Sequence, residues 1–183
     1  MFKCNNKGVT LIALVVTVIV IIILASISIT TGSNLIAKSK VENMITNMLI
    51  IKSKCRVLEE EIEGKTWDYS TEVEEGAELS KKEQGRREIF VNEHNFILVK
   101  NADATVYNLN ELANDSVYYV LEKEALSKMG LASLWEEGKS YYVIKYTVRD
   151  NKYEDINVYY TKGIKYNNKV YYDLDTLQNI DNE

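Results

Sequence analysis

The sequence has no proline and contains few of the histidines and cysteines that many enzymes use at their active sites. Its 183 residues include no proline, one histidine (His94) and two cysteines (Cys4 and Cys55). One histidine excludes metal sites built from several imidazoles and leaves little for a His-based triad. There is also no glycine-rich phosphate loop, serine-centred elbow or Cys-x-x-Cys motif. We therefore predict a protein that is not an enzyme and holds no metal or cofactor, with His94 as a plain surface histidine in a loop.

Acidic residues outnumber basic ones, 27 to 22. The net charge is -5, so the chain has no broad attraction for phosphate backbones, and nucleic acid is not expected as a main partner. Hydrophobic residues make up 46% of the chain and charged residues 27%, which is ordinary for a folded protein. The absence of proline is typical of long uninterrupted helices and strands.

Charge is missing altogether from residues 8–37. Within this stretch lies an apolar run, Leu11–Ile29, which as a helix spans about 28 Å, close to the roughly 30 Å hydrocarbon core of a bilayer. Two lysines, Lys3 and Lys7, precede the run, and the next charge is Lys38. The pattern predicts a transmembrane helix over residues 9–29 with its amino terminus in the cytoplasm.

Three interpretations compete for this segment. A cleaved signal peptide would release the chain near Ile29, but its apolar core is usually shorter and Ser26-Ile27-Ser28 is a poor cleavage site. A plain single-pass anchor, carrying an extracellular binding or adhesion module, explains the hydrophobicity but not the residues at its start. The third interpretation depends on those residues.

The apolar run begins with Lys7-Gly8-Val9-Thr10-Leu11-Ile12. This motif resembles the processing site of type IV prepilins and type II secretion pseudopilins, which have a short basic leader, a glycine and an apolar helix. The resemblance implies that residues 1–8 are a leader, cut between Gly8 and Val9 by a membrane-embedded prepilin peptidase, and that Val9 is N-methylated. Gly8 permits close backbone approach at the cut, and Lys7 holds the junction at the cytoplasmic interface.

The resemblance also implies what the processed chain does. It would be a structural subunit that joins other pilin-like subunits in a pilus or a secretion pseudopilus, helped by a membrane assembly platform and its ATPase. The chain would be held in the cell membrane with its head outside and later become part of an extracellular filament. One position departs from the family: Ala13 stands where an acidic residue is usual, so the customary pairing with a neighbour's terminal amine is lost.

Cleavage after Gly8 also decides the role of the cysteines. Cys4 would leave with the leader, so Cys55 would stand alone, without a disulfide or a paired-cysteine metal site. We therefore expect Cys55 to be a small apolar residue on a helix face.

Residues 30–63 are predicted to extend the same helix, ending before Gly64, so that it would run from Val9 to Glu63. Apolar residues recur there at alternating spacings of three and four, which forms a narrow seam on one face: Val41, Met44, Met48, Ile51, Cys55, Leu58 and Ile62. The seam either packs on the protein's own sheet, which we favour, or forms a two-chain coiled coil.

Residues 64–183 are predicted to form an α+β head in which the long helix packs on a small antiparallel sheet. We expect a loop at Ser70–Arg87, a helix at Glu122–Glu137 ended by Gly138, and turns at Asp150-Asn151-Lys152 and Asn167-Asn168-Lys169. The expected strands are Glu88–Val91, Phe96–Val99, Val117–Leu121, Ser140–Arg149, Glu154–Thr161 and Lys169–Leu174.

Four Tyr-Tyr pairs mark the predicted strands, and each should offer one ring to the core and one to the surface. The pairs are Tyr118-Tyr119, Tyr141-Tyr142, Tyr159-Tyr160 and Tyr171-Tyr172. The outer rings are either half-buried strand residues or an aromatic contact surface for a partner. Asp150, Asn151 and Asp155 do not follow an EF-hand spacing, so no calcium site is expected there.

Overall fold

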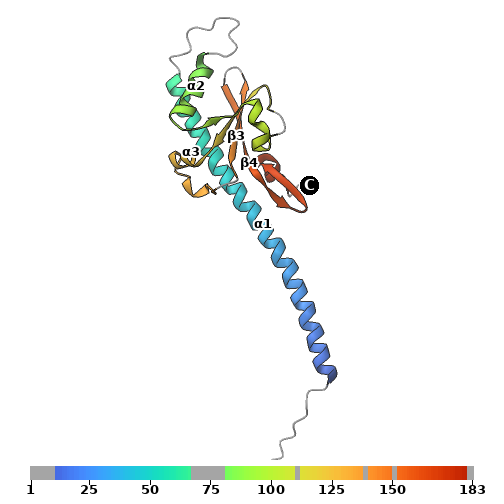
Figure 1. The fold of residues 1–183 in the computed structure, drawn as a ribbon. Helices are drawn as coiled ribbons and strands as arrows, with labels where there is room; N and C mark the ends of the chain where they lie inside the picture. The colour runs from blue at the N-terminus through green and yellow to red at the C-terminus, as the bar shows by residue number, and fades with distance from the viewer. Residues whose placement is uncertain (1–10, 67–80, 110–111, 138–139, 150–151, 181–183) are drawn as a thin grey trace, which may run out of the picture. The chain divides into compact units, whose positions relative to one another are not determined.

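The computed structural model describes residues 11–66, 81–109, 112–137, 140–149 and 152–180. The chain is an α+β protein with several helices and one five-stranded antiparallel sheet (Figure 1). It divides into two compact units, Met1–Lys40 and Val41–Glu183. Within the described ranges, none of the helices combines the length and apolar character that a membrane crossing requires.

The α-helices are α1 (Leu11–Thr66), α2 (Lys81–Asn92), α3 (Lys123–Lys128) and α4 (Leu174–Gln178), and two 3-10 helices are η2 (Asn101–Tyr107) and η3 (Ala132–Leu134). The strands are β1 (Ile97–Leu98), β2 (Ser116–Leu121), β3 (Tyr142–Arg149), β4 (Lys152–Tyr166) and β5 (Lys169–Asp173).

The sheet is a meander in which every strand pairs with its neighbours in sequence, in the order β1-β2-β3-β4-β5. The β4–β5 hairpin turns at Asn167 and Asn168, whose φ angles of 46° and 63° are those of a tight turn with both central residues in the left-handed region. The turn predicted at these asparagines is therefore confirmed. Irregular pairing between Tyr159 and Ile164 shows a bulge in β4, where Gly163 has a φ of 68°.

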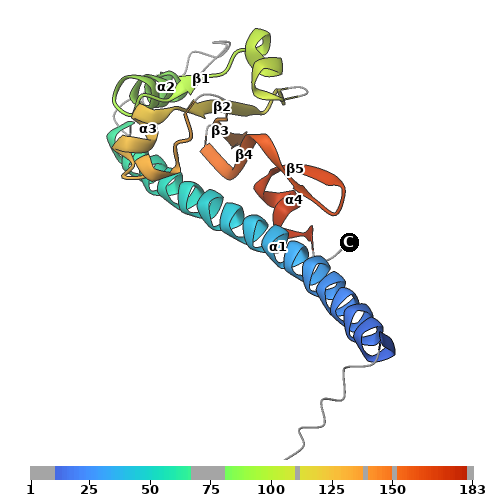
Figure 2. The same ribbon diagram turned by 60° about the horizontal axis from the view of Figure 1, so that its bottom comes forward.

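One face of the sheet packs on the second unit's share of α1, from Val41 onward (Figure 2). Inward-facing residues of the strands point into this core, and they include five tyrosine rings: Tyr119, Tyr142, Tyr146, Tyr153 and Tyr160. Leu174 and Leu177 of α4 are buried in the same core. The helix seam and the sheet therefore share a single aromatic-rich core.

The opposite face of the sheet carries a second, smaller apolar cluster. Val99, Ala104 and Leu109, from η2 and its flanks, are buried against Tyr118, Val120 and Val143 of the sheet. Asn108, in the left-handed region, ends η2, and its amide Nδ2 donates a hydrogen bond of 2.6 Å to the carbonyl oxygen of Thr161. The segment around η2, which the sequence did not predict as an element, thus covers part of the outer face.

This second cluster changes the prediction for the tyrosine pairs. Adjacent rings do point to opposite faces, but Tyr118 and Tyr119 are both buried, because η2 covers the outer ring of that pair. Of the other paired tyrosines that do not belong to the fully buried set, three are half-buried: Tyr141, Tyr159 and Tyr171. Within these pairs, Tyr172 is the one side chain that is exposed, at 39%. The described tyrosines therefore act mainly as core residues.

Several predicted boundaries are wrong. Glu88–Val91 is not a strand but part of α2, which also replaces the end of the predicted loop at Ser70–Arg87; residues 67–80 lie outside the described residues. The alternating apolar residues suggested a strand. Burial of Glu83, Arg86 and Phe90, at spacings of three and four, shows the helical period instead. Helix α1 ends at Thr66 rather than Glu63, with Gly64 inside it.

The predicted helix at Glu122–Glu137 is also shorter than expected. Helix α3 ends at Lys128, because Gly130 takes a left-handed φ of 73°. The amide of Leu131 donates to the carbonyl oxygen of Leu126 at 2.7 Å and that of Gly130 to Ser127 at 3.0 Å, which is the Schellman pattern. The expected stop at Gly138 lies outside the described residues.

At the carboxyl-terminal end, β5 stops at Asp173 rather than Leu174, because Asp173 caps a short helix that the sequence did not predict. Its carboxylate accepts a hydrogen bond of 3.0 Å from the backbone amide of Thr176. Strand β4 is longer than the predicted Glu154–Thr161, since its end pairs with β5 to form the hairpin. The predicted turn at Asp150-Asn151 lies outside the described residues.

Candidate interaction surface

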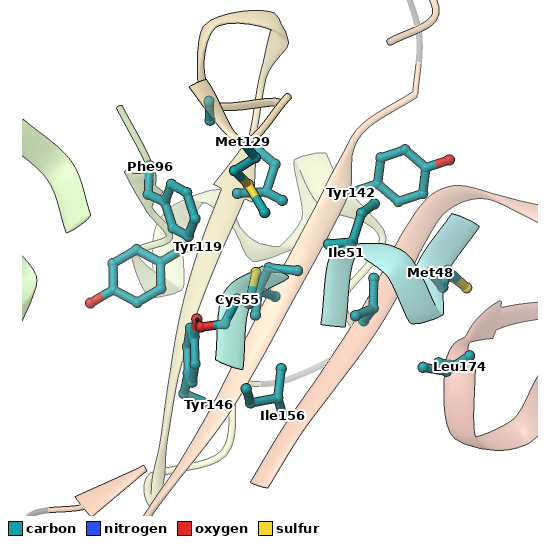
Figure 3. Close-up of a cluster of buried hydrophobic side chains, with 14 of the residues drawn as sticks. Met48, Ile51, Cys55, Phe96, Tyr119, Met129, Tyr142, Tyr146, Ile156 and Leu174 are labelled. Carbon is teal, nitrogen blue, oxygen red and sulfur yellow. Dashed lines mark hydrogen bonds between the residues drawn. The ribbon is translucent and has the colours of Figure 1, made fainter. Parts of the chain in front are cut away.

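The seam of α1 faces the sheet along the length that the structure describes. Five of its residues are buried, and Met44 and Leu58 are half-buried against the same core; the buried ones are Val41, Met48, Ile51, Cys55 and Ile62. Figure 3 shows Met48, Ile51 and Cys55 among Tyr142, Tyr146 and Ile156 of the strands. In this structure the seam is thus covered by the protein's own sheet, as the favoured interpretation expected.

Two tyrosine hydroxyls fix the depth at which the helix lies on the sheet. Tyr146 donates to the backbone carbonyl oxygen of Cys55 at 3.4 Å, and Tyr142 donates to the sulfur of Met44 at 3.7 Å. Both tyrosines belong to β3, the central strand of the sheet. Burial raises the pKa of Tyr142 to about 12 and that of Tyr146 well above its ordinary range. Both hydroxyls therefore stay protonated and keep donating at physiological pH.

Cys55 is a buried thiol without a disulfide. Desolvation by burial raises its pKa to about 12, and the hydrogen bond with Tyr146 opposes that rise. A neutral buried thiol is a poor nucleophile, because the thiolate is the reactive form. The structure therefore places Cys55 as an apolar core residue.

The buried thiol should make stability sensitive to alkaline pH. An unfolded thiol ionises near pH 8.5 while the folded one stays neutral to about 12, so between these values the free energy of unfolding falls by about 1.4 kcal/mol per pH unit. Below pH 8.5 both states are neutral, and the contribution of Cys55 is fully present. Urea unfolding in reducing buffer should show the advantage of the parent over Cys55→Ala shrinking by about 2 kcal/mol from pH 8 to pH 10. An advantage that stays constant over this range would contradict the assignment.

A buried charged cluster joins α2 to the sheet and to the end of α1. Glu83 accepts hydrogen bonds from the Tyr153 hydroxyl at 3.1 Å and from Arg87 Nε at 3.1 Å. Arg86, whose side chain is fully buried, lies 3.9 Å from Glu83 and 3.6 Å from Glu63. Its guanidinium stacks 4.9 Å from the centroid of the Tyr153 ring. The sequence did not predict this cluster, because Glu83 and Arg86 lie in the segment Ser70–Arg87, which was interpreted as a loop.

The face of α1 opposite the seam carries a second stripe, in which three exposed aliphatic side chains lie among polar ones. At 100° per residue, Thr46, Ile50, Ser53 and Val57 lie on one face, roughly opposite the seam. With Leu49 and Lys54 they line an open hollow of about 420 Å³. The exposed fractions are 38% for Leu49, 41% for Ile50 and 60% for Val57. We call these six residues the outer stripe.

The outer stripe was missed in the sequence because the seam dominates the apolar pattern. The signal was nevertheless present, since residues 46, 50, 53 and 57 follow a four-three-four spacing without any charge. Exposed aliphatic residues that occur singly are normal on a protein surface. Three of them grouped around one hollow on one helix form a small exposed apolar surface.

The processing residues Lys7, Gly8 and Val9 lie outside the described residues, and Ala13 lies within α1. In the first unit, α1 exposes a series of large apolar side chains, whose described members are Leu14, Val15, Val16, Val18, Ile19, Val20, Ile21, Ile22, Leu35 and Ile36.

The histidine differs from the prediction. His94 is half-buried and packs beside Phe90 and Phe96, with ring centroids 6.4 Å and 6.3 Å away. It is thus a packed residue rather than a plain surface one. Asp155 pairs with Lys52 of α1 at 3.7 Å. Among the residues that the structure describes, no group of three His, Cys, Asp or Glu side chains is arranged to hold a metal ion.

The chain matches no family model, no curated protein and no solved structure.

Proposed function

We propose that the chain is a pilin-like structural subunit, processed between Gly8 and Val9 and assembled through its first helix into a filament. The filament would be a type IV pilus or a type II secretion pseudopilus. The subunit would wait in the cell membrane, held by the apolar run Leu11–Ile29, before a platform and its ATPase place it in the filament.

The observation that carries this proposal is that α1, in the second unit, has three exposed aliphatic side chains on the face opposite its apolar seam. The seam is used by the protein's own sheet, while the outer stripe is open around a hollow of about 420 Å³. A helix that served only its own fold would need one apolar face, and its other face would be polar. A second stripe fits a helix that also packs against other helices, as a filament of helical subunits requires.

The sequence supports the same conclusion independently. The motif Lys7-Gly8-Val9-Thr10-Leu11-Ile12 resembles a prepilin processing site, and the apolar run after it provides a helix that neighbouring subunits can surround in place of lipid. The runner-up is a single-pass anchored binding or adhesion module that never assembles. Such a module needs neither cleavage at Gly8 nor an open apolar stripe.

The outer stripe can be tested with a pair of matched variants. Val57→Asp places a charge in the stripe, and Val106→Asp places the same charge on η2, where the valine is also exposed, at 69% against 60% for Val57. Burying an unpaired carboxylate in a subunit contact is costly. Val57→Asp should therefore reduce sheared surface filaments by about tenfold or more, which corresponds to about 1.4 kcal/mol per contact. Val106→Asp should leave them unchanged, and the amount of subunit in membranes should be equal for both.

The processing step is tested in the same cells by the mass of the amino-terminal peptide. The proposal expects a peptide that begins at Val9, and Gly8→Leu should abolish that cut while leaving the full chain in the membrane. A chain that keeps Met1 and makes no filaments would support the anchored module instead. If Val57→Asp makes as many filaments as the parent chain, the outer stripe is not a subunit contact.

A further inference from the structure

Strand β5 is an edge of the sheet whose hydrogen-bonding groups face in known directions. It is the last strand in the order, and within the described part of the chain it pairs only with β4. A two-residue turn at Asn167 and Asn168 makes Tyr166 and Lys169 a hydrogen-bonded pair, so inward and outward directions alternate from there. The backbone groups of Lys169 and Tyr171 therefore face β4, and those of Val170 and Tyr172 face outward.

The same two outward residues have exposed apolar side chains. Val170 is 46% exposed and Tyr172 is 39% exposed, whereas Tyr171, on the other face, packs on the core. Both lie over Gly163 of β4, where a built Cβ atom would come within 2.5 Å of Val170 and 2.8 Å of Tyr172. The bulge at Gly163 thus makes room for the two side chains, which form a small apolar surface beside the open edge.

We propose that β5 pairs antiparallel with β5 of a second copy of this chain, about a two-fold axis at Tyr171. In that register Val170 lies opposite Tyr172 of the second copy, and Tyr171 lies opposite its own counterpart. The outward backbone groups of Val170 and Tyr172 then pair with each other across the axis, as a hydrogen-bonded antiparallel pair requires. The two five-stranded sheets become one continuous sheet.

The charges of β5 favour a second copy of the same strand as its partner, and they favour antiparallel over parallel pairing. The strand begins with Lys169 and ends with Asp173. Antiparallel self-pairing places each lysine opposite an aspartate of the second copy, which stabilises a pair of strands, whereas parallel self-pairing would set like charges opposite each other. Asp173 also accepts hydrogen bonds from Thr176. A carboxylate has about four acceptor positions, so it can serve both partners.

The contact is small. A strand of five residues buries much less than the roughly 1,200 Å² of a stable specific interface. The dimer should therefore form at high protein concentration and separate on dilution. An edge strand with exposed Val and Tyr would otherwise be a site of uncontrolled pairing, and a self-complementary register directs that pairing into a closed dimer.

Cysteine cross-linking of the full chain tests the register. Val170→Cys and Tyr172→Cys are made separately on a Cys4→Ser background, where buried Cys55 is the remaining native thiol. A hydrogen-bonded antiparallel pair has its Cα atoms about 5.5 Å apart, within disulfide range, whereas two copies of the same variant place their cysteines diagonally, about 7–8 Å apart. Mild oxidation of an equal mixture in detergent should give about tenfold more disulfide dimer than either variant alone.

Two further variants separate this dimer from other associations. Lys169→Glu should lower cross-linking of the mixture about fivefold, because both ion pairs become repulsive, and Lys169→Arg should keep it. Val57→Asp, which removes the proposed filament contact, should leave cross-linking unchanged, so the two proposals fail separately. Equal cross-linking in the mixture and in each variant alone would overturn the register. Absence of cross-linking in the mixture at about 1 mM, where even weak contacts associate, would overturn the dimer and leave the edge to a different partner.

Discussion

Replacing Glu83 with leucine is expected to lower the free energy of unfolding by about 3–5 kcal/mol, the range for breaking a buried ion pair. The carboxylate of Glu83 is nearly inaccessible and accepts from Tyr153 and Arg87, besides lying near Arg86. Without the Glu83 carboxylate, the fully buried guanidinium of Arg86 still has Glu63 as an ion-pair partner at 3.6 Å. That glutamate is partly exposed to solvent, so it neutralises the buried charge less well. A buried charge that loses its closest buried counterion is strongly destabilising, which is why a large effect is expected.

Two variants show whether the charge itself is responsible. Glu83→Leu combined with Arg86→Met removes both buried charges and should recover at least half of the loss, because apolar replacement of a whole buried pair is often nearly neutral. Glu63→Gln, at the more exposed partner, should cost about 1 kcal/mol or less. Urea unfolding of the full chain, followed by circular dichroism, gives all three values. A double variant as unstable as Glu83→Leu alone would show that packing of α2, and not charge, causes the loss.

Ile51→Ala is expected to destabilise the protein by about 2–5 kcal/mol, the usual range for a buried isoleucine truncated to alanine. Ile51 is fully buried on the seam between α1 and the sheet, close to Tyr142 and Met48 (Figure 3). The surrounding rings are held by hydrogen bonds to the helix, so they have little freedom to collapse into the cavity. The cost should therefore lie in the upper half of that range.

The neighbouring residue provides the control, since Ile50→Ala removes the same atoms from the outer stripe of the same helix. Ile50 is 41% exposed on the outer stripe, so its truncation should change the free energy of unfolding by about 0.5 kcal/mol or less. In the host, Ile50→Ala should reduce the number of filaments although the folded subunit remains abundant, because the variant removes a subunit contact and not a core contact. Equal destabilisation by the two variants would contradict the assignment of the two faces.

The sequence allowed the prediction of an α+β protein because its periodicities are long and regular. The seam from Val41 to Ile62 alternates three and four residues over the second part of α1, and such a pattern fits only a helix. The strands of the carboxyl-terminal half were located because Tyr-Tyr pairs and β-branched residues lie between asparagine turns. The β4–β5 hairpin was predictable from Asn167 and Asn168, because both adopt positive φ angles that asparagine tolerates.

Short elements defined by tertiary contacts were not predictable. Helix α2 is held by contacts of Arg86 with Glu63 and of Glu83 with Tyr153, and both partners lie far away in the sequence. The segment around η2 is fixed by the contact of Asn108 with Thr161, which no local pattern indicates. The outer stripe is visible in the sequence only after the seam has been assigned. The motif at Gly8 depends on sequence alone, because it lies outside the described residues.

The order of strands in the sheet has a consequence for how the chain folds. Since each strand pairs with the one before it, every new strand that emerges from the ribosome or from a translocation channel finds its partner already present. The seam on α1 is made first, yet Leu174 and Leu177, which complete the core around it, arrive last. We therefore expect the nascent chain to expose the apolar seam of α1 until Leu174 and Leu177 have been made, and termination before Leu174 to produce a species that aggregates or is degraded.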